Sequence, residues 1–534
     1  MIFLSDENIS AIDQDAAFLE NFRRYARRRI SRITDQPSNY ILPEGGFPSP
    51  WRYDWERRSN AIYGTLMVIA QLRDIGRLDP KCAAMARSSE HWVRDMRDHI
   101  VSAPYWRPSG ANPSEPWDFN GWSNGLLPGA LGLCCAILDD TPSSAIEAFI
   151  MRGASWLADA SFPEAHYWHR RSTNHGIVIY SSFLLGAELL RLNNVDFVRR
   201  LNADWHAIMA DTAADGSYSE GLHYLVFAFD HALPLIWLKA QQSGWSLRHY
   251  PDGMNYFRLL PDYLNHATSA TGVPFANFGD EFLESWENSG VSRMTSALAG
   301  RPLAHHVPTG PFPLSYHAPI DYCLSTSIAS PIDGYRSTLF DKRRMAAVDY
   351  YRNGKKTSGL FVFGSKRHLT HSRNHDCGGF VLEIDGRPLV TARKGRSPLT
   401  GNTALAFNGD QFVDYTEPRD YDGDVHMSGT EIFATSSYNR DFRRVTGIQR
   451  CERRFTPDFE ESRITIETSV EASKRAAIAF NFVPAGDFRI GTCNENGAEL
   501  DPVVIDGTTC FVCPQEGNSR FLTTIEKEAV AGSR

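Results

Sequence analysis

The spacing of hydrophobic residues changes once along this chain, and the change limits the folds that the chain can adopt. From about residue 12 to residue 300, apolar residues recur every three or four positions, as in 60–78 and 176–192. This spacing is typical of helices. After about residue 335, short runs rich in Val, Phe, Thr and Ile end at turn dipeptides such as Asn353-Gly354 and Asp385-Gly386. These runs predict antiparallel strands.

The length of 534 residues allows two or three cores. We predict a helical domain over 1–300 and an antiparallel β-sandwich over 336–534, which is an α+β multidomain protein. About ten helical segments with short links indicate stacked antiparallel helix pairs. Five prolines make 301–335 the predicted linker: Pro302, Pro308, Pro311, Pro313 and Pro319.

Composition excludes several classes of protein. The net charge of -8 argues against a nucleic-acid coat protein that binds through its overall field. No run reaches the roughly 20 apolar residues that span a bilayer. The nine cysteines are scattered, with Cys134 and Cys135 adjacent in an apolar helical run, which favours reduced thiols. The N-terminal 18 residues resemble no secretion signal, so we expect a cytoplasmic protein, or a secreted or periplasmic one if a signal was trimmed.

The first motif with chemical potential is His-Arg-Arg-Ser-Thr-Asn-His-Gly at 169–176, directly before an apolar helix. Ser172 or Thr173 can cap that helix, which places Asn174 and His175 in or beside its first turn. Free backbone N–H groups and the helix dipole favour an anion there. The alternative is that Asn174 only helps to cap the helix and His175 only fills a pocket.

The second motif is Asp-Gly-Ser-Tyr-Ser-Glu-Gly-Leu-His-Tyr at 215–224. Ser217 and Glu220 have the spacing of a capping box, which predicts a helix start at this point. Tyr218 would then precede the first full turn, and His223 and Tyr224 would lie in the second. A tyrosine can donate a proton to a leaving alkoxide if its pKa is lowered or the proton moves in concert. The alternative is an ordinary half-buried tyrosine.

Together with Asn-Phe-Gly-Asp at 277–280 and the segment 375–389, these motifs resemble the heparinase II/III-like polysaccharide lyases in order and spacing. The resemblance covers about residues 110–410. It implies that the helices form an incomplete (α/α) toroid ahead of the β-sandwich. It also implies a carbon–oxygen lyase that cleaves a uronic-acid-containing polysaccharide or oligosaccharide by β-elimination, leaving an unsaturated uronate.

The resemblance assigns roles to the residues of the helical domain. Asn174 and His175 would neutralise the substrate carboxylate and so acidify the C5 proton. Tyr224 would donate a proton to the glycosidic oxygen and, depending on the stereochemistry of the uronate, also remove the C5 proton. We predict further substrate contacts from a basic residue, an imidazole and two indoles: Arg171, His223, Trp117 and Trp122.

The β-domain departs from the family pattern. The usual His-x-His-x-Asp is replaced by His-Ser-Arg-Asn-His-Asp at 371–376, so that Ser372 and Asn374 occupy the two histidine positions. His371, Arg373 and His375 nevertheless alternate, and on a strand they would share one face. We therefore predict that His371 or His375 acts as base or binding group and that Arg373 meets acid groups of the substrate.

The family's zinc site departs too. Ala392 and Gly401 stand where the resemblance expects an Asp and a His ligand. Because zinc needs three or four protein ligands, we predict no metal cofactor. The expected partner is an acidic polysaccharide or oligosaccharide, not a nucleic acid or a membrane, and a homodimer is an open alternative to a monomer.

Two other functions remain open. A toroid glycoside hydrolase would need two carboxylates flanking the scissile bond, and the sequence offers four candidates: Asp215, Glu220, Asp280 and Glu281. The non-enzymatic alternative is a degenerate relative that binds acidic oligosaccharides without cleaving them.

Overall fold

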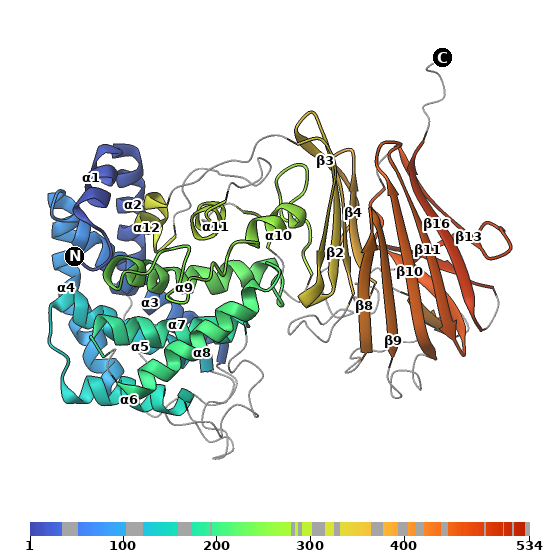
Figure 1. The fold of residues 1–534 in the computed structure, drawn as a ribbon. Helices are drawn as coiled ribbons and strands as arrows, with labels where there is room; N and C mark the ends of the chain where they lie inside the picture. The colour runs from blue at the N-terminus through green and yellow to red at the C-terminus, as the bar shows by residue number, and fades with distance from the viewer. Residues whose placement is uncertain are drawn as a thin grey trace.

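The structure is a computed structural model in which two kinds of layer follow each other along the chain, helices first and β-sheets second (Figure 1). It describes residues 1–34, 52–102, 121–158, 172–192, 195–278, 283–286, 291–301, 315–324, 332–364, 378–392, 404–408, 411–412, 421–438, 447–484, 487–505, 507–514 and 517–528.

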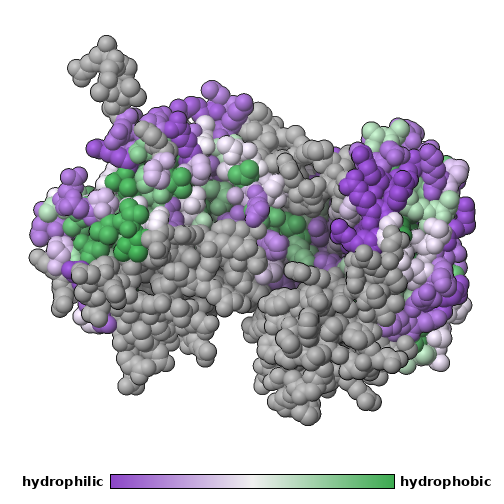
Figure 2. Space-filling model, turned by 180° about the vertical axis from the view of Figure 1, so that it is seen from behind, coloured by the Kyte–Doolittle hydropathy of each residue, from purple (hydrophilic) through white to green (hydrophobic). Residues whose placement is uncertain are grey.

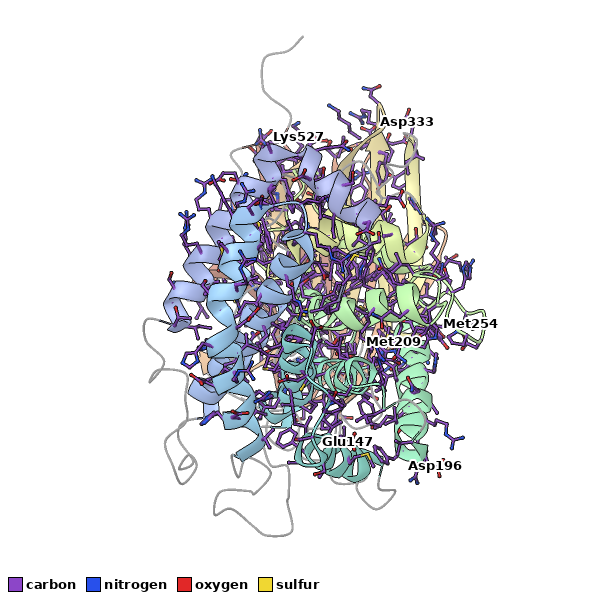
Figure 3. All side chains as sticks on the ribbon, turned by 90° about the vertical axis from the view of Figure 1, so that its left-hand side faces the viewer. Glu147, Asp196, Met209, Met254, Asp333 and Lys527 are labelled. Carbon is purple, nitrogen blue, oxygen red and sulfur yellow. The ribbon has the colours of Figure 1, made fainter. Side chains whose placement is uncertain are left out.

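Helices make up the N-terminal part of the described chain. They are α1 (Asp6–Gln14), α2 (Ala16–Thr34), α3 (Arg52–Ile75), α4 (Pro80–Ser102), α5 (Gly121–Leu138), α6 (Ser144–Ala158), α7 (Asn174–Leu189), α8 (Asp196–Ala213), α9 (Leu222–Gln242), α10 (Leu260–Ala267), α11 (Val291–Ala299) and α12 (Ala318–Cys323). Seen from the helical end, they surround an interior filled with side chains, and α8 runs upward along the right-hand side from Asp196 to Met209 (Figure 3). No helix in these ranges is long and apolar enough to cross a membrane.

Helix α7 lies at the centre of the helical domain and packs on α5, α8 and α9. Its apolar sequence is buried over almost its whole length, from Gly176 to Glu188, as a helix enclosed by others requires. The approach of α5 is close: a Cβ on Gly186 would lie 2.4 Å from the carbonyl oxygen of Pro128. The position of α7 is therefore fixed by backbone contact.

The strands form antiparallel sheets. They are β1 (Gly334–Phe340), β2 (Met345–Arg352), β3 (Lys355–Phe363), β4 (Phe380–Ile384), β5 (Arg387–Val390), β6 (Ala404–Asn408), β7 (Gln411–Phe412), β8 (Tyr421–Ser428), β9 (Glu431–Tyr438), β10 (Ile448–Asp458), β11 (Arg463–Ala472), β12 (Arg475–Phe480), β13 (Phe488–Asn494), β14 (Pro502–Ile505), β15 (Thr508–Val512) and β16 (Ser519–Lys527). Among the described strands, the sheet orders are β1-β2-β3-β4-β5, β13-β16-β11-β10-β9-β8 and β14-β15-β12-β6-β7.

The first sheet, β1 to β5, belongs to two cores at once. Met345 and Ala347 of β2 pack into the helical core, whereas Ala346 and Val348 pack into the core of the sandwich. Successive side chains of a strand point to opposite faces, so one strand can contribute to both cores.

The rear view shows hydrophilic side chains over much of the described surface of both halves (Figure 2).

Most predictions about elements are confirmed, and the linker is a correction. The predicted turns at Asn353-Gly354 and Asp385-Gly386 connect β2 to β3 and β4 to β5, with positive φ at all four residues. Within the predicted linker 301–335, however, α12 is a buried helix whose Ala318 and Ile320 join the helical core. Proline is tolerated at the start of a helix, so this part of the segment belongs to the helical domain. The described cysteines are free thiols.

A buried polar network joins the helical domain to the first sheet. His266 of α10 contacts Asp349 of β2 through Nδ1 at 2.8 Å, and Lys356 of β3 lies 2.8 Å from Asp349 and 3.6 Å from Glu383 of β4. Lys356 also donates to the carbonyl oxygen of Thr268 at 2.6 Å. Burial raises the pKa of Glu383 to about 7, although Lys356 opposes the shift. Burial acts in the same direction on Asp349, but Lys356 and His266 hold its pKa below the usual value.

Replacing Lys356 by Met should destabilise the protein by about 3 to 5 kcal/mol, because it removes the buried cation that Asp349 and Glu383 share and leaves Asp349 with His266 alone. Urea unfolding measures the loss. Lys527→Met is the matched control: its ion pair with Asp385 is partly exposed, so that change should cost at most about 1 kcal/mol. Equal effects of the two changes would show that the buried network does not hold the domains together.

Candidate active site

The start of α7 is formed as the sequence predicted. Thr173 is the N-cap residue, in extended conformation, and its Oγ1 accepts a hydrogen bond from the N–H of Gly176 at 3.1 Å. Asn174 and His175 are the first two residues of the helix. Both therefore lie in the first turn.

The predicted capping box at 217–220 is wrong. Helix α9 begins at Leu222, after Gly221 with φ +85°, so His223 and Tyr224 lie in the first turn and not in the second. Ser217 instead donates to Asp215 Oδ1 from its backbone N–H at 3.0 Å and from its hydroxyl at 2.5 Å. A residue with positive φ cannot continue a right-handed helix. A side chain at Gly221 would also clash, because its Cβ would lie 2.2 Å from the carbonyl oxygen of Phe278.

Glu220 forms a hydrogen bond with the start of α7 and does not cap α9. Its Oε2 accepts hydrogen bonds from the backbone N–H of Asn174 and, at 3.1 Å, from the hydroxyl of Tyr218. This contact joins the two sequence motifs in one place. It also corrects the expectation that the first N–H groups of α7 are free for an anion, since Glu220 takes that of Asn174 and Thr173 takes that of Gly176.

The side chain of Asn174 is a buried polar group at the start of α7. It is 2 % exposed, and its Nδ2 has no hydrogen-bond acceptor among the described residues. An amide N–H left buried without a partner costs about 1 to 3 kcal/mol, so the position favours a ligand with an acceptor oxygen. His175, next along the helix, is half-buried.

Two tyrosines near the site have opposite environments. Tyr218 is fully buried, and burial together with the adjacent Glu220 raises the pKa of its phenol well above the usual value. Tyr224 is half-buried on the first turn of α9, with its ring perpendicular to that of His223 and the centroids 5.3 Å apart. Of the two phenols, Tyr224 is therefore the one that is partly exposed to solvent.

Two basic residues of the β-domain, which the sequence did not indicate as site residues, contact the segments before α7 and α9. Arg343, in the 3-10 helix η3 (Asp341–Arg343) after β1, donates to Ser172 Oγ at 2.8 Å and to Asp211 Oδ2 of α8 at 3.0 Å. Lys342 lies 2.8 Å from Asp211 and donates its N–H to Asp215 at 2.8 Å. Burial would raise the pKa of Asp211, but Arg343 and Lys342 lower it to about 2. In the sequence these residues stand out only as the basic run 342–344, which does not show which acidic side chains they contact.

The remaining predicted site residues lie outside the described part of the chain, as does the side chain of Trp122 in α5. They are Arg171, Trp117, His371, Arg373 and His375. Ala392 is described: it is half-buried and packs against the helical core. Its methyl group offers no donor atom where the resemblance expects a zinc ligand, so this residue does not fit the family's metal. Within the described ranges, no three His, Cys, Asp or Glu side chains are arranged to hold a metal ion.

The carboxylates considered for a hydrolase are occupied where they are described. Asp215 accepts from Ser217 and from the backbone of Lys342, and Glu220 accepts from Asn174 and Tyr218. Asp280 and Glu281 lie outside the described residues. Asp215 and Glu220 thus act as hydrogen-bond acceptors for the protein itself.

This fold, a helical domain ahead of a β-sandwich, is similar to that of solved heparinase III and heparan sulfate lyase structures. A heparinase III with methylated lysines superposes with a TM-score of 0.55 at 11% identity, covering 100% of this chain and 93% of that one. A second heparinase III structure gives 0.52 at 13% identity, with coverage of 99% and 85%. Heparan sulfate lyase HepC from Pedobacter heparinus gives 0.50 at 12% identity, with coverage of 99% and 91%.

These likenesses confirm the predicted fold, an α/α toroid followed by a β-sandwich. No protein-family profile and no curated protein matches the sequence.

Proposed function

We propose that the protein is a lyase that cleaves a uronic-acid-containing polysaccharide or oligosaccharide by β-elimination. The observation that carries the proposal is the buried Nδ2 of Asn174, which has no acceptor among the described residues and is held at the first turn of α7 by the same loop that leads to Tyr224. A carboxylate oxygen is the acceptor that this amide lacks. Solved structures with this fold include heparinase III and heparan sulfate lyase HepC, and both names are consistent with such a substrate.

The reaction needs two groups at one uronate. Asn174, assisted by His175, donates to the carboxylate and stabilises the negative charge that develops when the C5–H bond breaks. Tyr224 gives its proton to the glycosidic oxygen as the C4–O bond breaks and the C4–C5 double bond forms. The base that takes the C5 proton is Tyr224 itself or a histidine of the β-domain, His371 or His375. No water is consumed.

A screen of acidic glycans tests this function. Incubation with a panel of uronate-containing polysaccharides and oligosaccharides should give products that absorb in the ultraviolet, because elimination leaves a conjugated double bond. New reducing ends without ultraviolet absorption would identify a hydrolase. Binding of an acidic oligosaccharide without any product would identify a carbohydrate-binding protein.

We also propose that the reaction proceeds without zinc in the family's β-domain position. The methyl group of Ala392 supports this proposal, since it cannot replace a carboxylate ligand. Protein purified without added metal should contain well under one zinc per chain by elemental analysis, and treatment with a chelator should leave its turnover unchanged. Stoichiometric zinc lost together with activity would contradict the proposal.

A further inference from the structure

Glu220 lies beside Asn174 and has no role in the reaction proposed above. The residue is 2 % exposed, and its carboxylate accepts hydrogen bonds from the first N–H of α7 and from the Tyr218 hydroxyl. The loop that carries it has little freedom: Gly216 and Gly221 both have φ +85°, and a Cβ on either would meet a carbonyl oxygen within 2.3 Å. Ser219 adds a long hydrogen bond of 3.5 Å to the carbonyl oxygen of Ser172.

We propose that Glu220 is a positioning residue that fixes the Asn174 side chain and sets the affinity of the site for the substrate carboxylate. The inference rests on the proposed function. Asn174 is the residue whose backbone Glu220 holds, and Tyr224 follows Glu220 by four positions. One carboxylate thus ties the carboxylate-binding amide to the segment that delivers the proton donor.

The charge of Glu220 has a second consequence. The start of a helix carries a partial positive charge that attracts anions, and here a carboxylate of the protein already occupies it. An arriving uronate therefore meets a negative charge at the start of α7 and binds through the Asn174 side chain instead of the backbone N–H groups. Glu220 weakens ground-state binding while it orients the amide that acts in the transition state, a division that favours kcat over affinity.

Glu220→Gln separates these two effects, because it keeps the size of the side chain and removes its charge. With an acidic oligosaccharide as substrate, kcat should fall about tenfold, since misplacing a catalytic group by about 1 Å can cost up to a hundredfold. KM should fall about two- to fivefold, the range of a helix-terminus charge interaction. Amide hydrogen exchange over 172–178 should become faster. A loss of packing alone would not lower KM.

The matched control is Glu188→Gln. Glu188 lies at the other end of α7, is 8 % exposed, and pairs with Lys239 of α9. This change should lower the unfolding midpoint and leave kcat and KM at the wild-type values.

Three outcomes decide the proposal. Unchanged kcat, KM and exchange in Glu220→Gln would overturn it. A fall in kcat together with a rise in KM and a lower unfolding midpoint would also overturn it, because general destabilisation would then explain the loss of activity. If the wild-type protein forms no unsaturated uronate, yet Glu220→Gln speeds exchange at 172–178 and binds a uronate oligosaccharide more tightly in calorimetry, the proposed function fails and the positioning role stands.

Discussion

Replacing Tyr224 by Phe should lower the rate of unsaturated-uronate formation by about 10² to 10⁴-fold, the contribution of a positioned acid or base. The change removes one hydroxyl from a half-buried ring on the first turn of α9, so the fold should persist. The measurement is the initial increase in ultraviolet absorbance on the glycan that proves active, with thermal unfolding followed in parallel.

Tyr218→Phe provides the comparison for Tyr224→Phe. Tyr218 is fully buried, and its hydroxyl donates to Glu220, so its loss should cost about 1 kcal/mol of stability and have a mild effect on turnover. Burial and Glu220 keep its pKa well above the usual value, and its complete burial keeps the hydroxyl away from a substrate. Near-normal turnover in Tyr224→Phe, with activity abolished in Tyr218→Phe, would contradict our assignment of Tyr224 as the proton donor.

The features predicted correctly from the sequence are those that depend on neighbouring residues. The period of the apolar residues separated helices from strands because it records which side chains face a core. The start of α7 was predicted because Thr173 caps the helix through a residue three positions away. The turns at Asn353-Gly354 and Asp385-Gly386 followed from the tolerance of these residues for positive φ.

The errors arose where distant parts of the chain decide between local alternatives. Ser217 and Glu220 have the spacing of a capping box, but the carbonyl oxygen of Phe278 demands glycine at 221, and Glu220 bonds to α7. The pair of Arg343 and Asp211 joins residues 132 positions apart. No short pattern identifies such a pair, yet it fixes Ser172, two residues before Asn174.

Replacing Asn174 by Ala should lower turnover about a hundredfold, because losing one donor aimed at developing charge commonly costs about 3 kcal/mol. The stability of the protein should change little. The side chain has no hydrogen-bond acceptor among the described residues for Nδ2, and alanine is well suited to a helix. Binding of a uronate oligosaccharide should weaken as well, which calorimetry measures independently of turnover.

The neighbouring Thr173→Ala tests whether Asn174 is a catalytic or a capping residue. Thr173 is the residue that caps α7, through its bond to Gly176, so its replacement should cost about 1 kcal/mol of stability and lower turnover much less than Asn174→Ala does. Thr173→Ala should therefore lose more stability than Asn174→Ala does, and Asn174→Ala should lose more turnover. If Asn174→Ala instead lost stability like Thr173→Ala and kept its turnover, Asn174 would be a capping residue, and the buried amide would have to be satisfied by the protein itself.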